Sequence, residues 1–196
     1  MTETERPLRA DARRNRERIL AAAGELFAEQ GQAAQMDDIA AHCGLGLGTL
    51  YRHFPTKEAL LTAIVGRRFA GMADLAREAE RIDDPGAAFE AVLRGYLAAA
   101  DGDAAFQLAL LGSESPQWAG IAEQKTEFRA AVTRIIERAV AAGAIRADFT
   151  FADFPLIACG VMAAMHFQPG GNTNWRRLLD LLLAGLRPEA AAARRV

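Results

Sequence analysis

The sequence predicts an all-α fold, in which an N-terminal three-helix domain is joined by a long helix to a larger C-terminal helical domain. Apolar residues recur at helical spacing along most of the chain. Alanine is abundant, β-branched residues are sparse, and no alternating strand pattern persists. Glycine and proline, for example at Gly31, Gly44 and Pro55, interrupt the pattern and divide it into separate helices.

The N-terminal part is expected to consist of a short leader followed by four helices. Residues 1–10 are predicted to be a disordered basic leader, because they combine Pro7 with mixed charge. Thr56 is a good N-cap for a long helix that has Glu58 in its first turn. The expected helices cover residues 11–30, 37–43, 47–54 and 57–82.

The C-terminal part is expected to add four or five helices. Ser115 followed by Pro116 is typical of a helix start, and the segment from Thr150 to Asp153 resembles a capping box. The expected helices cover residues 85–100, 104–111, 115–143, 150–167 and 175–186. These helices place a first domain at residues 11–56 and a second domain at residues 57–196.

Composition is typical of a soluble globular protein. The 196 residues are 51% hydrophobic and 24% charged, with a net charge of −2, which argues against disorder. Every window of about 18 residues carries a charge, so we expect no membrane span. The first residues do not resemble a signal peptide, and two cysteines make no disulfide framework. We therefore expect a cytoplasmic protein.

The charge is unevenly distributed. Between Arg6 and Arg18, six arginines face two acidic residues, whereas from Phe69 onward 13 basic residues face 16 acidic ones. A basic arm on a mildly acidic body favours a polyanion bound near the N-terminus. The alternative is a solvated leader with no partner.

The most informative segment is residues 35–54, where two short helices flank a turn centred on Gly44. This spacing predicts a helix-turn-helix, which places its second helix in the major groove of DNA. The segment resembles the TetR family of bacterial transcriptional regulators. The resemblance is carried by Leu26-Phe-Ala-Glu-Gln-Gly31, Asp37-Asp-Ile-Ala40, Gly44, Gly48-Thr-Leu-Tyr-Arg-His-Phe54 and Lys57-Glu-Ala-Leu60.

The resemblance implies a DNA-binding domain followed by a helical domain for ligand binding and dimerisation, and repression that a small molecule relieves. Two positions depart from the family pattern: Gln35 and Met36 stand where a capping Thr is usual, and Gly46 stands where the turn usually has Ser. Both changes remove short side chains that cap a helix or bond a phosphate.

Roles at the DNA follow from side-chain chemistry together with this resemblance. Tyr51, His53 and Lys57 are expected to bind phosphates, and Thr49 and Arg52 to reach base edges. Gly48 permits close backbone approach, and the arginines at 13, 14, 16 and 18 are expected to attract DNA generally. The predicted DNA-binding residues are Arg14, Gln35, Gly46, Leu47, Gly48, Thr49, Tyr51, Arg52, His53 and Lys57.

A pocket for a small apolar effector is predicted in the second domain, where aromatic and sulfur-containing side chains lie on four or more helices. Tyr96 and His166 are the candidates for orienting polar groups. A filled core is the alternative explanation. The predicted pocket residues are Phe69, Met72, Phe89, Tyr96, Phe106, Trp118, Phe128, Cys159, Met162 and His166.

A two-fold homodimer is predicted through the last two long helices. The segment 156–167 is apolar around its whole circumference, and the final helix has a wide leucine face. Pairing with a second copy would form a four-helix bundle and present two recognition helices to a palindromic operator. The predicted interface residues are Gly160, Ala164, Trp175, Leu179, Leu182 and Leu183. The alternative is that both helices fill a monomeric core.

Other chemistries are weaker fits to the sequence. Cys159, Met162 and His166 share a helix face but are better explained as core than as metal ligands. The glycines between Gly44 and Gly48 follow a helix, not the strand that a dinucleotide fingerprint needs. We expect no cofactor, no metal and no catalysis. The rival hypotheses are a helical enzyme or carrier with a vestigial helix-turn-helix, and an activator or nucleoid-type binder without a ligand.

Overall fold

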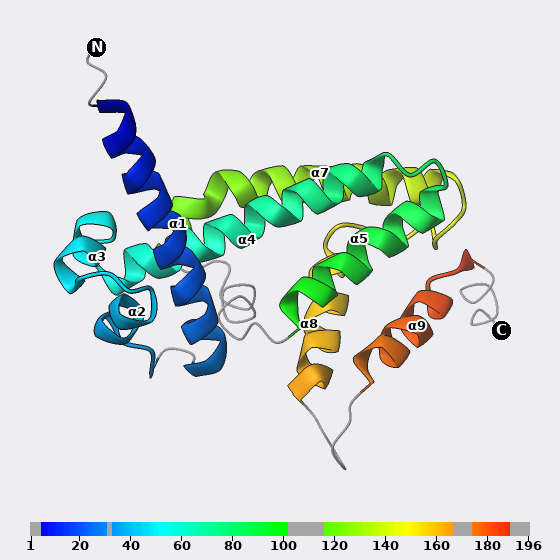
Figure 1. The fold of residues 1–196 in the computed structure, drawn as a ribbon. Helices are drawn as coiled ribbons and strands as arrows, with labels where there is room; N and C mark the ends of the chain where they lie inside the picture. The colour runs from blue at the N-terminus through cyan, green and yellow to red at the C-terminus, as the bar shows by residue number, and fades with distance from the viewer. Residues whose placement is uncertain (1–4, 31–32, 102–115, 167–173, 189–196) are drawn as a thin grey trace. The chain divides into compact units, whose positions relative to one another are not determined.

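The computed structural model describes residues 5–30, 33–101, 116–166 and 174–188, and every regular element within them is helical (Figure 1). The predicted all-α fold is confirmed. Among these described residues, no helix is both long enough and apolar enough to cross a membrane. The expected helix at 104–111 lies outside the described residues.

The chain divides into two compact units. Unit 1 consists of Met1–Arg68 with Asp103–Ile121, and unit 2 consists of Phe69–Gly102 with Ala122–Val196. Helix α4 (Lys57–Glu80) contributes its first half to unit 1 and its second half to unit 2. The division therefore falls inside the long helix, whereas the sequence pattern places the end of the first domain before that helix begins.

Unit 1 is built on α1 (Glu5–Gln30), with α2 (Met36–His42) and α3 (Leu47–His53) packed together. Helix α1 begins six residues earlier than expected, so the prediction of a disordered leader is wrong from Glu5 onward. The reason is that Pro7 lies in the first turn, where its missing N–H group would have no helical partner in any case. The fully buried side chains of its core include Ile19, Phe27, Ile39, Leu50 and Leu60.

The turn between α2 and α3 is a Schellman motif centred on Gly44. Gly44 has φ of +63°, a conformation that favours glycine. The N–H of Gly44 donates to the carbonyl of Ala41 at 3.1 Å, and the N–H of Leu45 donates to the carbonyl of Ala40 at 3.0 Å. The same arrangement, with φ of +66° at Gly143, ends α7 (Ala122–Ala141).

Unit 2 contains α5 (Pro85–Ala100), α7, α8 (Asp153–His166) and α9 (Trp175–Gly185); α5 contacts α7 and α8, and α8 contacts α9. The single helix expected over 115–143 is a 3₁₀ segment, Pro116–Ile121, followed by α7. Gly120, which has low helix propensity, lies at this junction. One of the two hydrogen bonds of the predicted capping box is present: the Asp153 carboxylate accepts the N–H of Thr150 at 2.8 Å.

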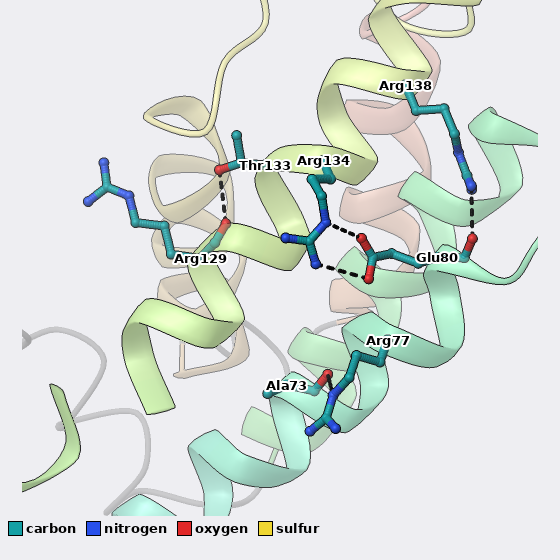
Figure 2. Close-up of polar contacts among 7 residues, drawn as sticks. All are labelled: Ala73, Arg77, Glu80, Arg129, Thr133, Arg134 and Arg138. Carbon is teal, nitrogen blue, oxygen red and sulfur yellow. Dashed lines mark hydrogen bonds and ion pairs between the residues drawn. The ribbon is translucent and has the colours of Figure 1, made fainter. Parts of the chain in front are cut away.

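The end of α4 is fastened to α7 by two arginines (Figure 2). The Arg138 guanidinium donates to the carbonyls of Glu80, at 2.8 Å, and Ile82, at 2.7 Å, so it caps the C-terminus of α4. Arg134 forms a two-bond ion pair with the Glu80 carboxylate at 2.7 and 3.2 Å. The Arg138 side chain is half-buried, whereas 58% of the Arg134 side chain is exposed.

These two arginines are expected to differ in their effect on stability. Arg138→Met removes charged donors from two backbone carbonyls, so it should lower the free energy of unfolding by about 2–3 kcal/mol. Arg134→Met breaks a solvent-screened ion pair and should cost about 0–1 kcal/mol. Urea denaturation of both variants measures the difference, and equal losses would contradict the capping role of Arg138.

Candidate nucleic-acid interface

Helix α3 presents an outer face that is largely apolar. Leu50 is fully buried, and Phe54, which follows the helix, is 2% exposed, so together they fix the helix against unit 1. Leu47 is 41% exposed and Tyr51 is 44% exposed, and they lie one helical turn apart. Gly48 and Arg52 are also exposed. The face that a DNA groove would meet therefore carries an aliphatic and a phenolic side chain.

The two side chains predicted to read bases bind to each other. The Arg52 guanidinium donates to the Thr49 hydroxyl at 2.9 Å. Thr49 is half-buried, whereas Arg52 is exposed. In this arrangement the threonine hydroxyl is already engaged, and the guanidinium keeps its remaining N–H donors for an acceptor outside the helix.

The N-terminus of α4 lies in the same unit and carries the predicted phosphate-binding lysine. Thr56 caps the helix as predicted, because its hydroxyl accepts the N–H of Ala59 at 3.1 Å. The Lys57 ammonium lies 5.8 Å from the centre of the Phe27 ring. The pKa of Glu58 is lowered by its backbone hydrogen bond, then by the Thr56 hydroxyl and by the charge of Lys57. The carboxylate is thus held ionised beside the helix N-terminus.

The positions where the sequence departs from the family pattern lack side-chain caps, as expected. Gln35 stands at the N-cap of α2, but its side-chain amide donates to the Ala33 carbonyl at 2.8 Å and does not cap the helix. Gly46 stands at the N-cap of α3 and has no side chain to offer. His53, in the last turn of α3, is half-buried.

The arginines of α1 make internal contacts that the sequence did not predict. Arg14 pairs with Asp11, and the Arg16 guanidinium lies 4.5 Å from the centre of the Phe54 ring. Arg18 donates to the Cys43 carbonyl at 2.6 Å, which is the last carbonyl before Gly44. Arg18 therefore holds α1 against the turn of the motif. Its partner is 25 residues away, so no local pattern could have revealed it.

A second contact between α1 and the helix-turn-helix was also not predicted from the sequence. The imidazole of His42, at the end of α2, lies 3.0 Å from the Glu25 carboxylate. Both side chains are largely exposed, so this pair contributes little to stability.

The described residues of the predicted effector pocket lie in unit 2, most of them are buried, and several meet in one aromatic cluster. Tyr96 stacks on Phe128 with ring centroids 5.5 Å apart, and Phe154 packs edge-on against Tyr96 at 5.3 Å. Phe154 was missing from the prediction, because it stands between Asp153 and Pro155, ahead of the apolar segment 156–167. Phe89 packs edge-on against Phe149 at 5.3 Å.

The remaining predicted pocket residues fall into two groups. Phe69, Met72 and Met162 are buried, and Cys159 is half-buried. Phe106 and the side chains of Trp118 and His166 lie outside the described residues. The described members are therefore largely buried, and an opening among them stays a prediction.

A cleft of the described part of unit 2 lies elsewhere, beside the start of α8. Its volume is about 320 Å³, and none of the predicted pocket residues lines it. An ion pair between Arg146 and Asp148, at 2.5 Å, stands in its wall. Its apolar lining comes from Phe149, Leu156, Ile157 and Leu186.

The predicted dimer interface needs one correction. Leu179 has no exposed surface, and Trp175 is 6% exposed, with its indole N–H donating to Asp101 at 2.8 Å. These two residues belong to the core of their own chain, which leaves them little or no surface for a second copy. Gly160 is exposed, and Ala164, Leu182 and Leu183 are half-buried. The leucines that face outward are Leu156, 70% exposed, and Leu181, 56% exposed.

Two family models match the chain. Residues 19–64 match the model for bacterial regulatory proteins of the tetR family. Residues 84–188 match the model for the C-terminal domain of SbtR-like transcriptional regulators.

Similar proteins include both curated regulators and solved structures. The HTH-type transcriptional regulator UidR of Escherichia coli is 46% identical over 59 residues, which span 30% of this chain and 30% of that protein. A TetR transcription regulatory protein from Mycobacterium vanbaalenii is 32% identical, with a TM-score of 0.67, over 92% of this chain and 99% of that one. SCO0520, a TetR transcriptional regulator from Streptomyces coelicolor, is 34% identical, with a TM-score of 0.63, over 88% of this chain and 98% of that one.

A more distant structure shares the fold. AibR, solved in complex with isovaleryl coenzyme A and operator DNA, is 21% identical, with a TM-score of 0.68, over 89% of this chain and 98% of that one.

Arg18 and Lys57 are expected to act on DNA binding in different ways. Lys57→Gln should reduce the slope of log affinity against log salt by about one, because one phosphate contact is lost. Arg18→Gln should weaken binding without changing the slope, since its guanidinium holds the turn. Fluorescence anisotropy at several salt concentrations measures both, with Arg13→Gln on the same helix as the control for a lost charge. A slope change for Arg18→Gln equal to that for Lys57→Gln would contradict the positioning role.

Tyr96 should make the protein less stable at high pH. Burial, and to a smaller extent Cys159, raises the pKa of Tyr96 above its ordinary value. Above about pH 10 the unfolded chain loses this proton and the folded chain keeps it, so the free energy of unfolding falls as pH rises. Between pH 10 and 11 this ionisation should lower the free energy of unfolding of the wild type by about 1 kcal/mol, and Tyr96→Phe should abolish that loss. Tyr51→Phe, at the exposed tyrosine, is the control and should leave that loss in place.

Proposed function

The chain belongs to the TetR family of bacterial regulatory proteins, and we propose that it is a repressor that binds a palindromic operator as a homodimer and is released by a small apolar ligand. It is a transcriptional regulator with a helix-turn-helix DNA-binding domain. The observation that carries the proposal is the exposed outer face of α3, held outward by the buried Leu50 and by the Schellman turn at Gly44.

The loss of the usual capping side chains does not favour a vestigial motif. Backbone hydrogen bonds from Gly44 and Leu45 close the turn, and Arg18 holds it from α1. The geometry that presents α3 therefore depends on groups that this sequence retains. An enzyme or a carrier with a degenerate motif has no comparable observation in its favour.

Dimerisation is supported by the outward leucines of unit 2. Leu156 on α8 and Leu181 on α9 are large aliphatic side chains with more than half of their surface exposed. Gly160 and Ala163, on α8, are small and exposed, which permits close approach of a second helix. A two-fold dimer would set two α3 helices on half-sites about 34 Å apart.

Ligand release is supported by the chemistry of unit 2 and by a relative's complex. The aromatic cluster around Tyr96 is apolar and carries the phenolic hydroxyl of Tyr96 as a polar group, a combination typical of sites for small ligands. AibR, which shares the fold, was solved with both isovaleryl coenzyme A and operator DNA. A ligand that favours a conformation poor at DNA binding would relieve repression.

Operator binding should be specific and strongly salt-dependent. Selection from random DNA should enrich a palindrome, and affinity for it should fall steeply between low and physiological salt because several phosphates are neutralised. The Tyr51→Phe, Lys57→Ala double variant should bind at least tenfold more weakly. Unchanged affinity in that variant would remove these residues from the interface.

Substitutions in α9 should separate the dimer surface from the core. Leu181→Glu places a charge on an outward position and should give a folded monomer with much weaker operator affinity. Leu179→Glu buries a charge in the core and should unfold the protein. Analytical ultracentrifugation and circular dichroism distinguish the two. A wild-type monomer at micromolar concentration would refute the dimer.

A further inference from the structure

We infer that Leu47 reads a thymine in each half of the operator, through apolar contact with the C5-methyl group in the major groove. This inference rests on the proposed operator binding and names the chemistry by which α3 selects its site. Leu47 is 41% exposed in the first turn of α3, whereas Leu45 is half-buried and Leu50 is fully buried. Among these three leucines of the motif, Leu47 contributes least to the core of unit 1.

The backbone on both sides of Leu47 is bare. A Cβ atom added at Gly46 or at Gly48 would have no heavy atom within 4 Å. Neither glycine is therefore required by tight packing inside the protein. With no side chain on either neighbour, the first turn of α3 can approach base edges closely, and the leucine projects beyond the surrounding backbone.

Leu47 is the one aliphatic side chain exposed on α3, beside polar side chains that include the exposed Arg52 and the half-buried Thr49. The Thr49 hydroxyl already accepts from Arg52 at 2.9 Å. Leu47 and Tyr51 lie one turn apart on the outer face, and both expose more than 40% of their surface. In the major groove the C5-methyl of thymine is the apolar group, since the other base edges present hydrogen-bond donors and acceptors. An isobutyl side chain therefore gains most from burial against that methyl.

The positive charge on and near α3 favours DNA as the partner of this face. Helix α3 contains no acidic residue and carries Arg52 and His53 in its last turn. Lys57 begins α4, four residues after α3 ends. An apolar side chain on a helix with this charge suits a groove of DNA, where phosphates meet the cations and base edges meet the leucine.

The test removes single methyl groups from the DNA. The operator is first selected from random DNA with the full chain, and each thymine is then replaced in turn by deoxyuridine. Replacement of the thymine that Leu47 contacts in one half-site should lower the affinity of the wild type about fourfold. Replacement of the equivalent thymine in both half-sites should lower it about 15-fold. Leu47→Ala should bind more weakly to the parent operator and be indifferent to the same replacement. Leu47→Asn, which keeps the size and branching of the side chain but is polar, should be equally indifferent.

Thr49→Ser is the matched control, because it deletes the one methyl group of α3 that belongs neither to Leu47 nor to the buried Leu50, and it keeps the hydroxyl that Arg52 binds. This variant should retain the sensitivity to deoxyuridine. Sensitivity lost in Thr49→Ser and kept in Leu47→Ala would overturn the inference, as would a wild type indifferent to every replacement. If selection enriches no sequence, the proposed function itself fails, and the inference fails with it.

Discussion

The DNA-binding unit depends on one tight turn. Gly44, at φ of +63°, lets the chain reverse between α2 and α3 while its own N–H and that of Leu45 satisfy the last carbonyls of α2. A side chain at this position would be strained, and its Cβ would lie 3.4 Å from the Arg18 guanidinium. The turn sets the angle of α3, and that angle decides that Leu50 points into the core while Leu47 and Tyr51 face outward.

The same turn explains how the motif tolerates the loss of its usual capping side chains. Gln35 and Gly46 offer no cap, yet both short helices are present, because the N–H groups of Gly44 and Leu45 close the C-terminal end of α2 and Arg18 of α1 binds the Cys43 carbonyl. The substitutions change the chemistry of the outer face of α3, not its position. A face that would otherwise present a hydroxyl beside the first turn presents a leucine between two glycines.

In unit 2, two different sets of apolar side chains occupy the same helices. On α8, Phe154 packs into the aromatic cluster with Tyr96, while Leu156 faces outward. On α9, Leu179 is fully buried, while Leu181 is exposed. Each helix therefore contributes to the core of its own chain and still keeps an apolar surface. Burying that surface against a second copy would remove it from water without disturbing the core.

Interactions between residues close together in the chain could be predicted from the sequence. The helices, the turn at Gly44, the Thr56 cap and the bond between Thr150 and Asp153 all depend on groups within a few positions of one another. Their patterns of periodicity and capping can be recognised without knowing what packs against them. The family resemblance rests on the same short segments.

Only the tertiary structure decided which side of each helix is used and which long-range partners meet. The leucines of α9 form one broad stripe in the sequence, so nothing local tells that Leu179 is core and Leu181 is surface. The bond from Arg18 to Cys43 and the cap that Arg138 places on α4 join residues 25 and more than 50 positions apart. Such choices depend on how helices pack in three dimensions, because burial and long-range hydrogen bonding are properties of the assembled core and not of any one segment.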